Sequence, residues 1–397
     1  MLRTPTTKVT LVLVTIVVAV LTSVLSFFRV YKGNIVVTDK SLPPLTQQQL
    51  LGKACHNETF GFGEIVYISM PFRTDRQDAM NLLAAYSDVK LNLIPGVDGK
   101  TMSRKEIPDH TPKDVRQTEL GCWRAHVNAW RYMLDSHHET MLIVEDDIDW
   151  DYNIKDILEL LSTEIRKNTE LRLKPMTNRE QQTAPYGLDW DMLVLGQCND
   201  EANPARRDLY HSYEDPNSPS FSQIFERFIP HMSSLIDPTK IGVQRVISPS
   251  YGPICTMGYA ITRKGAMRLI AELSYIGLDG AVDEALQHRF MDGGLRGLTV
   301  TPPLFNGWRV NGAKDTDNQN WRYYNTVQGL GNAGAFSRNI KNSTRTQMIA
   351  DLSQNVWEEY DKIKPIDPSF KARKPIYATT TFVPPAEATS KQGGKHQ

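Results

Sequence analysis

Short apolar runs alternate with amphipathic segments along the middle of the chain. Apolar runs bounded by glycine, proline or polar residues are typical of buried strands, and they predict strands at 64–70, 91–94, 141–144, 191–195, 257–262 and 298–300. Apolar residues spaced along one helical face predict helices at 75–86, 120–137, 156–167 and 263–273. Because strands and helices alternate, the pattern predicts an α/β fold with a mostly parallel sheet.

The N-terminal region departs from this pattern. Residues 9–28 are twenty consecutive uncharged positions, which is enough for a helix to cross the core of a bilayer. A cleaved signal peptide is the alternative, but its apolar region is usually about 7–15 residues long. We therefore expect a cytosolic tail at 1–8, one transmembrane anchor at 9–28 and a polar stem at 29–63.

The rest of the chain divides into a body and a tail. We expect a single catalytic domain at 64–344, in which the polar, proline- and serine-rich segment 199–250 is an inserted loop region. One more helix and a disordered tail are expected at 345–397.

Composition narrows the possible functions. The chain has 45 basic and 45 acidic residues, and this balance argues against a nucleic-acid partner. Its four cysteines include no CxxC pair, which excludes a zinc ribbon. Four cysteines allow three pairings, and a lumenal compartment permits a disulfide between Cys198 and Cys255, which flank two predicted strands. Cys122 is expected to be a free thiol on an apolar helix face.

An acidic segment follows the strand predicted at 141–144. It contains Glu145, Asp146, Asp147 and Asp149. Ligands of open α/β sheets bind at the carboxyl ends of strands, and closely spaced carboxylates favour a cation. Hard oxygen ligands suit Mg²⁺ or Mn²⁺, which can in turn hold a diphosphate. The alternative is a solvated acidic turn that caps the next helix.

Two further pairs have both a functional and a structural interpretation. Asp283 and Glu284 are candidates for acid–base chemistry, although acids also stabilise a helix N-terminus. Cys122 and His126 are four residues apart on a predicted helix. That spacing suits a metal site, but it is more often found on a buried helix face.

The order of the motifs along the chain is more specific than any one of them. The segments are 65–68, 73–76, 96–99, 120–126, 142–147, 191–196, 258–266 and 282–284. Together they resemble glycosyltransferase family 25, which includes lipopolysaccharide galactosyltransferases and collagen hydroxylysine galactosyltransferases. There are two departures. Ala125 stands where the family usually has serine. The insertion at 199–250 is long, so the family's acceptor-binding residues cannot be assigned to positions of this chain.

The resemblance implies a GT-A type, Rossmann-like fold, a UDP-sugar donor and inversion at the anomeric carbon. It implies that Glu145 and Asp147 hold Mn²⁺ or Mg²⁺, and that Asp283 or Glu284 is the catalytic base or completes the metal site. The donor-binding residues that it implies are Arg73, Arg76, Asp98, His126 and Asp146. For the two arginines, the alternative is a surface ion pair with Asp75 or Asp78.

We therefore expect an inverting, metal-dependent glycosyltransferase that moves a sugar, with galactose preferred, to a hydroxyl of a glycan or glycoprotein. We expect a single-pass type II protein of the Golgi or endoplasmic reticulum membrane with a lumenal catalytic domain. Sequons at Asn57 and Asn342 fit a lumenal body. One alternative is an inactive member that binds a sugar or a partner in the lumen. Another is a metal phosphohydrolase, which usually places histidines near its carboxylates.

Overall fold

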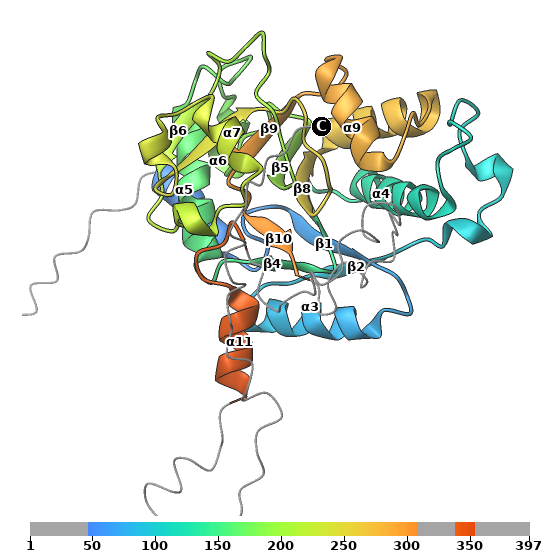
Figure 1. The fold of residues 1–397 in the computed structure, drawn as a ribbon, viewed down its shortest axis with the longest axis horizontal. Helices are drawn as coiled ribbons and strands as arrows, with labels where there is room; N and C mark the ends of the chain where they lie inside the picture. The colour runs from blue at the N-terminus through green and yellow to red at the C-terminus, as the bar shows by residue number, and fades with distance from the viewer. Residues whose placement is uncertain (1–46, 309–337, 354–397) are drawn as a thin grey trace, which may run out of the picture. The chain divides into compact units, whose positions relative to one another are not determined.

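A computed structural model describes residues 47–308 and 338–353, which belong to one compact unit that begins at Gln47 (Figure 1). The expected cytosolic tail and anchor, and the tail from Lys364, lie outside the described residues. Within the described part of the chain, no helix is long and apolar enough to cross a membrane.

An eight-stranded sheet has the order β2-β1-β3-β8-β5-β9-β7-β6. The strands are β1 Glu64–Ser69, β2 Asn92–Pro95, β3 Thr140–Glu145, β5 Met192–Gly196, β6 His211–Glu214, β7 Gln244–Pro249, β8 Gly258–Thr262 and β9 Gly297–Thr301. β8 and β7 pair antiparallel with each of their neighbours, whereas β1 pairs in parallel with β2 and β3, and β5 with β9. All the other strands therefore run in one direction, which confirms the mostly parallel sheet.

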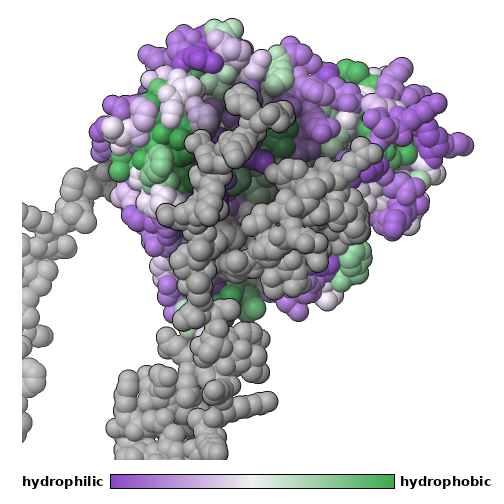
Figure 2. Space-filling view, viewed as in Figure 1, coloured by the Kyte–Doolittle hydropathy of each residue, from purple (hydrophilic) through white to green (hydrophobic). Residues whose placement is uncertain are grey.

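Helices cover both faces of the sheet. They are α2 Gln47–Lys53, α3 Thr74–Tyr86, α4 Gln117–Asp135, α5 Ile154–Lys167, α6 Asn178–Thr183, α7 Phe228–Ser233, α8 Arg263–Ile270, α9 Val282–Met291 and α11 Thr344–Leu352. α3 and α5 pack in one hydrophobic cluster with the sheet, and α4, α8 and α9 in another. Hydrophilic side chains predominate on the described part of the face seen in Figure 2.

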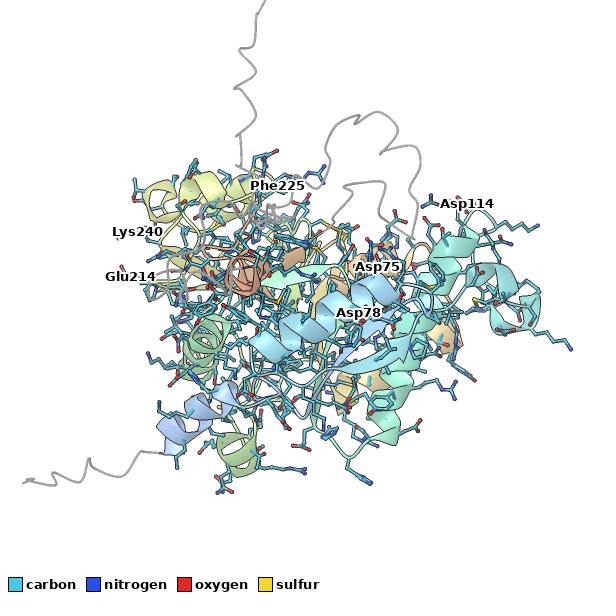
Figure 3. All side chains as sticks on the ribbon, turned by 90° about the horizontal axis from the view of Figure 1, so that it is seen from below. Asp75, Asp78, Asp114, Glu214, Phe225 and Lys240 are labelled. Atoms are coloured by element: carbon cyan, nitrogen blue, oxygen red, sulfur yellow. A yellow bond between two sulfur atoms is a disulfide. The ribbon has the colours of Figure 1, made fainter. Side chains whose placement is uncertain are left out.

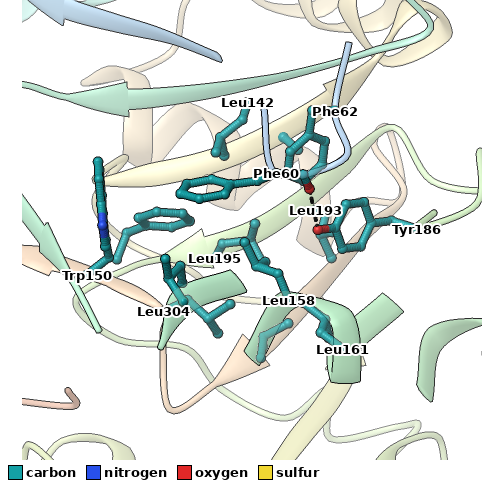
Figure 4. Close-up of a cluster of buried hydrophobic side chains, with 14 of the residues drawn as sticks. Phe60, Phe62, Leu142, Trp150, Leu158, Leu161, Tyr186, Leu193, Leu195 and Leu304 are labelled. Atoms are coloured by element: carbon teal, nitrogen blue, oxygen red, sulfur yellow. Dashed lines mark hydrogen bonds between the residues drawn. The ribbon is translucent and has the colours of Figure 1, made fainter. Parts of the chain in front are cut away.

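Alternation along β3 explains why both faces are covered. Leu142 belongs to the cluster with α3 and α5, and Ile143 belongs to the cluster with α4, α8 and α9. Successive strand residues point to opposite faces, so an uninterrupted apolar run is buried on both sides. Figure 4 shows the first cluster, in which the Tyr186 hydroxyl donates to the backbone oxygen of Phe60 over 2.6 Å.

A second, two-stranded sheet pairs β4 Ile148–Trp150 with β10 Phe305–Gly307. α11 lies against α3 and β4. The helix expected after residue 344 is therefore part of the body rather than of a separate tail.

Two of the expected boundaries are wrong. Residues 47–63 of the expected stem form α2, the short helix η1 Ala54–His56 and a turn, and the side chains of Phe60 and Phe62 are buried. The insertion at 199–250 contains β6, α7 and β7, and both of its strands join the main sheet. β6 escaped the pattern because it is short and lies at the edge of the sheet, where partly polar side chains are tolerated. β7 lies inside the sheet, but polar residues and a proline interrupt its apolar run.

Candidate active site at the carboxyl edge of the sheet

The carboxyl edge of the sheet is the edge at which β1, β2 and β3 end. Because β8 runs the other way, its first residue Gly258 pairs with Val144 near the end of β3 and with Gly196 at the end of β5. The segments after β3, before β8 and after β5 therefore meet at this edge. It is the part of an open α/β sheet where ligands commonly bind.

The loop after β2 reaches this edge by packing directly on α4. A Cβ atom on Gly99 would lie 1.7 Å from the backbone oxygen of Gln117, and one on Gly121 would lie 2.3 Å from that of Val97. Only glycine permits so close an approach. The packing fixes the exposed Asp98, whose carboxylate accepts a 3.0 Å hydrogen bond from the amide of Lys100.

Asp146 and Asp147 share one arginine, and we call them the arginine-paired acids. Arg76 of α3 donates to Asp146 over 2.6 Å, and the same nitrogen lies 3.6 Å from Asp147. Burial and the neighbouring charge of Asp147 raise the pKa of Asp146, although Arg76 acts in the opposite direction. Burial alone would lower the pKa of Arg76, but the two acids outweigh it and the pKa is raised. Arg76 therefore links two buried carboxylates that lie next to each other in the sequence.

Glu145 and Asp283 are held instead by the turn 254–257, and we call them the turn-held acids. Thr256 Oγ1 donates to Glu145 over 2.7 Å, and the amide of Cys255 donates to Asp283 over 3.1 Å. A second amide, that of Glu284, also donates to Asp283 over 3.1 Å. Hydroxyl and amide donors thus orient these two carboxylates.

Glu145 and Asp146 point to opposite sides of the sheet. Glu145 continues the side-chain alternation of Met141 and Ile143, toward α4 and α9, whereas Asp146 points to Arg76 on α3. The expected pairing of Glu145 with Asp147 at one cation stays a prediction. Among the described residues, the group of three ligand atoms close enough to hold a metal lies elsewhere, at His56, Asp156 and Glu159 of η1 and α5.

Asp149, the last member of the acidic segment, has a structural role. It is fully buried, and it accepts hydrogen bonds from Ser343 Oγ over 2.6 Å and from the amide of Arg345 over 3.2 Å. These groups form the first turn of α11, so Asp149 caps that helix. The segment is therefore neither one continuous ligand set nor a solvated turn.

Arg73 makes the surface ion pair that was the alternative to donor binding. Its guanidinium donates to both carboxylate oxygens of Asp75, over 2.9 and 2.8 Å. The hydrogen bond from Arg73 lowers the pKa of Asp75 to about 2. Figure 3 shows Asp75 and Asp78 on α3. The Asp75 side chain is 64% exposed, whereas that of Arg73 is only 11% exposed, so solvent reaches the carboxylate more than the guanidinium.

His126 lies in the core, which contradicts a direct contact with the donor. It is 1% exposed, and its Nδ1 lies 2.8 Å from the hydroxyl of Tyr259, to which Trp130 Nε1 also donates over 2.9 Å. Burial lowers the pKa of His126 to about 4, so the ring is neutral. The packing interpretation of this helix face is the one that the structure supports.

The two candidates for the base, which are adjacent residues of α9, have different surroundings. Asp283 is half-buried and bonded to Cys255, whereas Glu284 is exposed. Adjacent helical residues point about 100° apart, so only one of them can face the edge. Asp283 is that residue.

The cysteine expectations are confirmed. Cys198 and Cys255 form a disulfide, and Cys122 is free. Burial, together with the charges of Glu145 and Asp283, raises the pKa of Cys122, so its thiol is protonated. Thr256 was missed by sequence reasoning, and the signal that could have found it is its place beside a bridged cysteine just before a strand.

Comparisons with known proteins show that the residues at this edge lie within a region that matches a protein-family model. The family model described as "Glycosyltransferase family 25 (LPS biosynthesis protein)" matches residues 63–286. The chain is similar to Procollagen galactosyltransferase 2 of Homo sapiens (21% identity over 57% of this chain and 30% of that protein) and to Procollagen galactosyltransferase 1 of Danio rerio (23%, 60% and 33%). It is also similar to Inactive glycosyltransferase 25 family member 3 of Homo sapiens (22%, 36% and 24%). The chain thus spans about a third or less of the length of these relatives.

Proposed function

The chain belongs to glycosyltransferase family 25, and on this premise we propose that it transfers a sugar from a UDP-sugar to a hydroxyl of a glycan or glycoprotein. We propose galactose as the sugar, because procollagen galactosyltransferases are among the relatives. The observation that carries the proposal is the meeting of arginine-paired and turn-held acids at the carboxyl edge, inside the matched region.

The side chains at this edge fit a divalent cation. Their ligand atoms are carboxylate oxygens, which suit Mn²⁺ or Mg²⁺. Burial, together with the neighbouring charge of Asp147, raises the pKa of Asp146, and a bound cation would favour its ionised form. We propose Asp147 as the primary ligand and Glu145 as the second. Such ions are commonly bound by one or two carboxylates and by substrate phosphates, so no preformed cage of three residues is needed. When bound, the cation would neutralise the charge of the leaving diphosphate.

Arg73 is the side chain that we propose for the donor phosphates. Its partner Asp75 is largely exposed, and exposed ion pairs contribute little, so a phosphate can replace the carboxylate at low cost. Arg76 has a different role, because it is committed to the arginine-paired acids and keeps them in place. Asp98 stays a predicted donor contact at the same edge.

Asp283 is the proposed proton acceptor. Two backbone amides fix its carboxylate, and its half-buried position leaves it accessible. In the proposed transfer, the acceptor oxygen bonds to the anomeric carbon while the bond from that carbon to the diphosphate oxygen breaks. UDP leaves with the bonding electrons, the hydroxyl proton moves to Asp283, and the configuration at the anomeric carbon inverts.

We propose that the enzyme acts in the lumen of the Golgi or endoplasmic reticulum, anchored through residues 9–28 as a type II protein. The disulfide supports this proposal, because such bonds persist in oxidising compartments. Deletion of residues 1–32 is expected to release a soluble enzyme that still transfers sugar. Natural secretion with an N-terminus near Gly33 would indicate a cleaved signal instead.

A donor screen tests the proposed activity. The purified lumenal body is incubated with a panel of UDP-sugars and Mn²⁺, and free UDP is measured with and without glycan acceptors. We expect one donor to be turned over, and turnover to be lost in Asp283→Asn. Failure of every donor would favour the inactive alternative, for which inactive relatives in the same family are a precedent.

A further inference from the structure

The turn 254–257, which we call the disulfide turn, joins segments that are far apart in the sequence. The bond between Cys198 and Cys255 ties it to the segment after β5, across a sequence separation of 57. Two backbone hydrogen bonds flank the disulfide: the amide of Cys198 donates to Ile254 over 2.8 Å, and the amide of Ile254 donates to Asn199 over 3.0 Å. One side of the turn is thereby fixed by covalent and backbone bonds.

The other side of the turn holds the two turn-held acids. Thr256, which is 5% exposed, donates its hydroxyl to Glu145 over 2.7 Å, and Cys255 donates its amide to Asp283 over 3.1 Å. The backbone of Glu145 is held too, because its amide donates to Met257 over 3.2 Å. Glu145 ends β3 and Asp283 lies in the first turn of α9, so the disulfide turn connects two elements of different layers.

The backbone of Cys255 shows that this arrangement is held by its surroundings. Its φ of +72° lies in the left-handed region, which residues with a Cβ atom seldom adopt. Such a conformation persists where surrounding bonds over-determine it, and it is found often at functional sites. Here the disulfide and the flanking hydrogen bonds supply that constraint.

We propose that the disulfide turn is a positioning device for sugar transfer and that it makes the site sensitive to redox state. Thr256 is a positioning residue that orients Glu145 toward the cation, and the amide of Cys255 orients Asp283 toward the acceptor hydroxyl. This inference rests on the proposed function. A dithiol reductant would transfer two electrons and two protons to Cys198 and Cys255, becoming a disulfide itself, and would release the turn.

A matched pair of variants tests the role of the Thr256 hydroxyl. Thr256→Val keeps the shape and removes the donor, whereas Thr256→Ser keeps the donor. We expect Thr256→Val to weaken Mn²⁺ binding about tenfold, measured by calorimetry in the presence of UDP, and Thr256→Ser to restore it. A purely structural hydroxyl would instead lower the melting temperature without metal and leave the Mn²⁺ affinity unchanged.

The disulfide is tested with the wild-type chain and with the double variant Cys198→Ser, Cys255→Ser. Dithiothreitol is expected to lower the turnover of the wild type reversibly, with reoxidation restoring it, and to leave the residual turnover of the double variant unchanged. Mass measurement of alkylated thiols confirms the reduction. Full turnover by a wild-type chain whose Cys198 and Cys255 are both alkylated would overturn the redox part of the proposal.

Failure of this inference can be distinguished from failure of the proposed function. If the wild type turns over a UDP-sugar with Mn²⁺, and Thr256→Val binds Mn²⁺ as tightly as Thr256→Ser does, the function stands and the positioning role of Thr256 falls. If the wild type neither binds Mn²⁺ in the presence of UDP nor turns over any donor, both fall together.

Discussion

The arginine-paired acids and the turn-held acids lie at the same edge of one sheet but are held by different means. Asp146 and Asp147 face a guanidinium, at 2.6 and 3.6 Å, in a nearly buried position. Glu145 and Asp283 face a hydroxyl and amides. Arg76 holds the arginine-paired acids in the fold, whereas the hydroxyl of Thr256 and two backbone amides orient the turn-held acids. We therefore assign the proton transfer to the turn-held side.

The largest effect is expected at the turn-held Asp283. Asp283→Asn keeps the shape and one of the two accepting oxygens but cannot accept the proton, so we expect kcat to fall by about 10²–10⁴-fold while UDP-sugar affinity is retained. Steady-state kinetics and calorimetry with UDP measure the two quantities. Glu284→Gln, at the exposed neighbouring position, is the matched control and should retain most of the turnover. Equal losses in both variants would contradict the assignment.

A loss of stability is expected on the arginine-paired side. Arg76→Met removes the guanidinium that pairs with the buried carboxylate of Asp146, and removal of one partner of a buried pair typically costs about 3–5 kcal/mol. The pKa of Asp146, already raised, would rise further. A raised folded pKa means that stability is lost as pH increases through it, so the deficit of the variant should be larger at pH 7.5 than at pH 5. Urea unfolding at the two pH values checks this, and a deficit independent of pH would show that the charges are not its cause.

Asp200 tests how burial changes the pKa of a carboxyl group that forms no ion pair with another described residue. It is 1% exposed, one carboxylate oxygen lacks a hydrogen-bond partner, and burial raises its pKa to about 6. Stability from this group is present below pH 4 and is lost as pH rises through about 6. We expect Asp200→Asn to be more stable than the wild type at pH 7.5, by about 2–3 kcal/mol, with the gap closing toward pH 4. A gap of constant size across that range would refute the charge explanation.

The smallest effect is expected at the exposed pair of Arg73 and Asp75. Asp75→Asn should change the free energy of unfolding by less than about 1 kcal/mol, because exposed ion pairs contribute little. Donor affinity should stay the same or increase, since Asp75 no longer competes with phosphate for Arg73. A clear loss of donor binding would show that the pair itself is part of the site.

The sequence was sufficient for the central sheet because β1, β3 and β5 are strongly apolar and buried on both sides. It was insufficient for the short edge strand β6 and for β7, because polar residues interrupt the apolar pattern of both. The sequence also could not predict the direction of β8, because an apolar run such as 258–262 is compatible with a parallel or an antiparallel strand. That direction matters, because it brings the residues before β8 to the site.

Sequence motifs located the acids of the site but did not separate their roles. Glu145 and Asp149 look alike in an acidic run. Glu145 accepts a hydrogen bond from a hydroxyl at the carboxyl edge, whereas Asp149 caps α11, which is almost 200 positions away in the sequence. His126 was predicted to bind the donor because it lies in one of the family's motifs. It is instead a core residue whose ring lies beside the hydroxyl of Tyr259. Such contacts depend on tertiary structure, which neither spacing nor residue type reveals.

Release of UDP from a UDP-sugar by the purified lumenal body, with and without Mn²⁺, tests the central claim most directly when wild type and Asp147→Asn are measured together. The account predicts release by the wild type that requires Mn²⁺, and a variant whose folding is intact but whose apparent Mn²⁺ affinity is at least about tenfold weaker. Equal, Mn²⁺-dependent release by both proteins would contradict the assignment of Asp147, and no release by the wild type would contradict the proposed transfer itself.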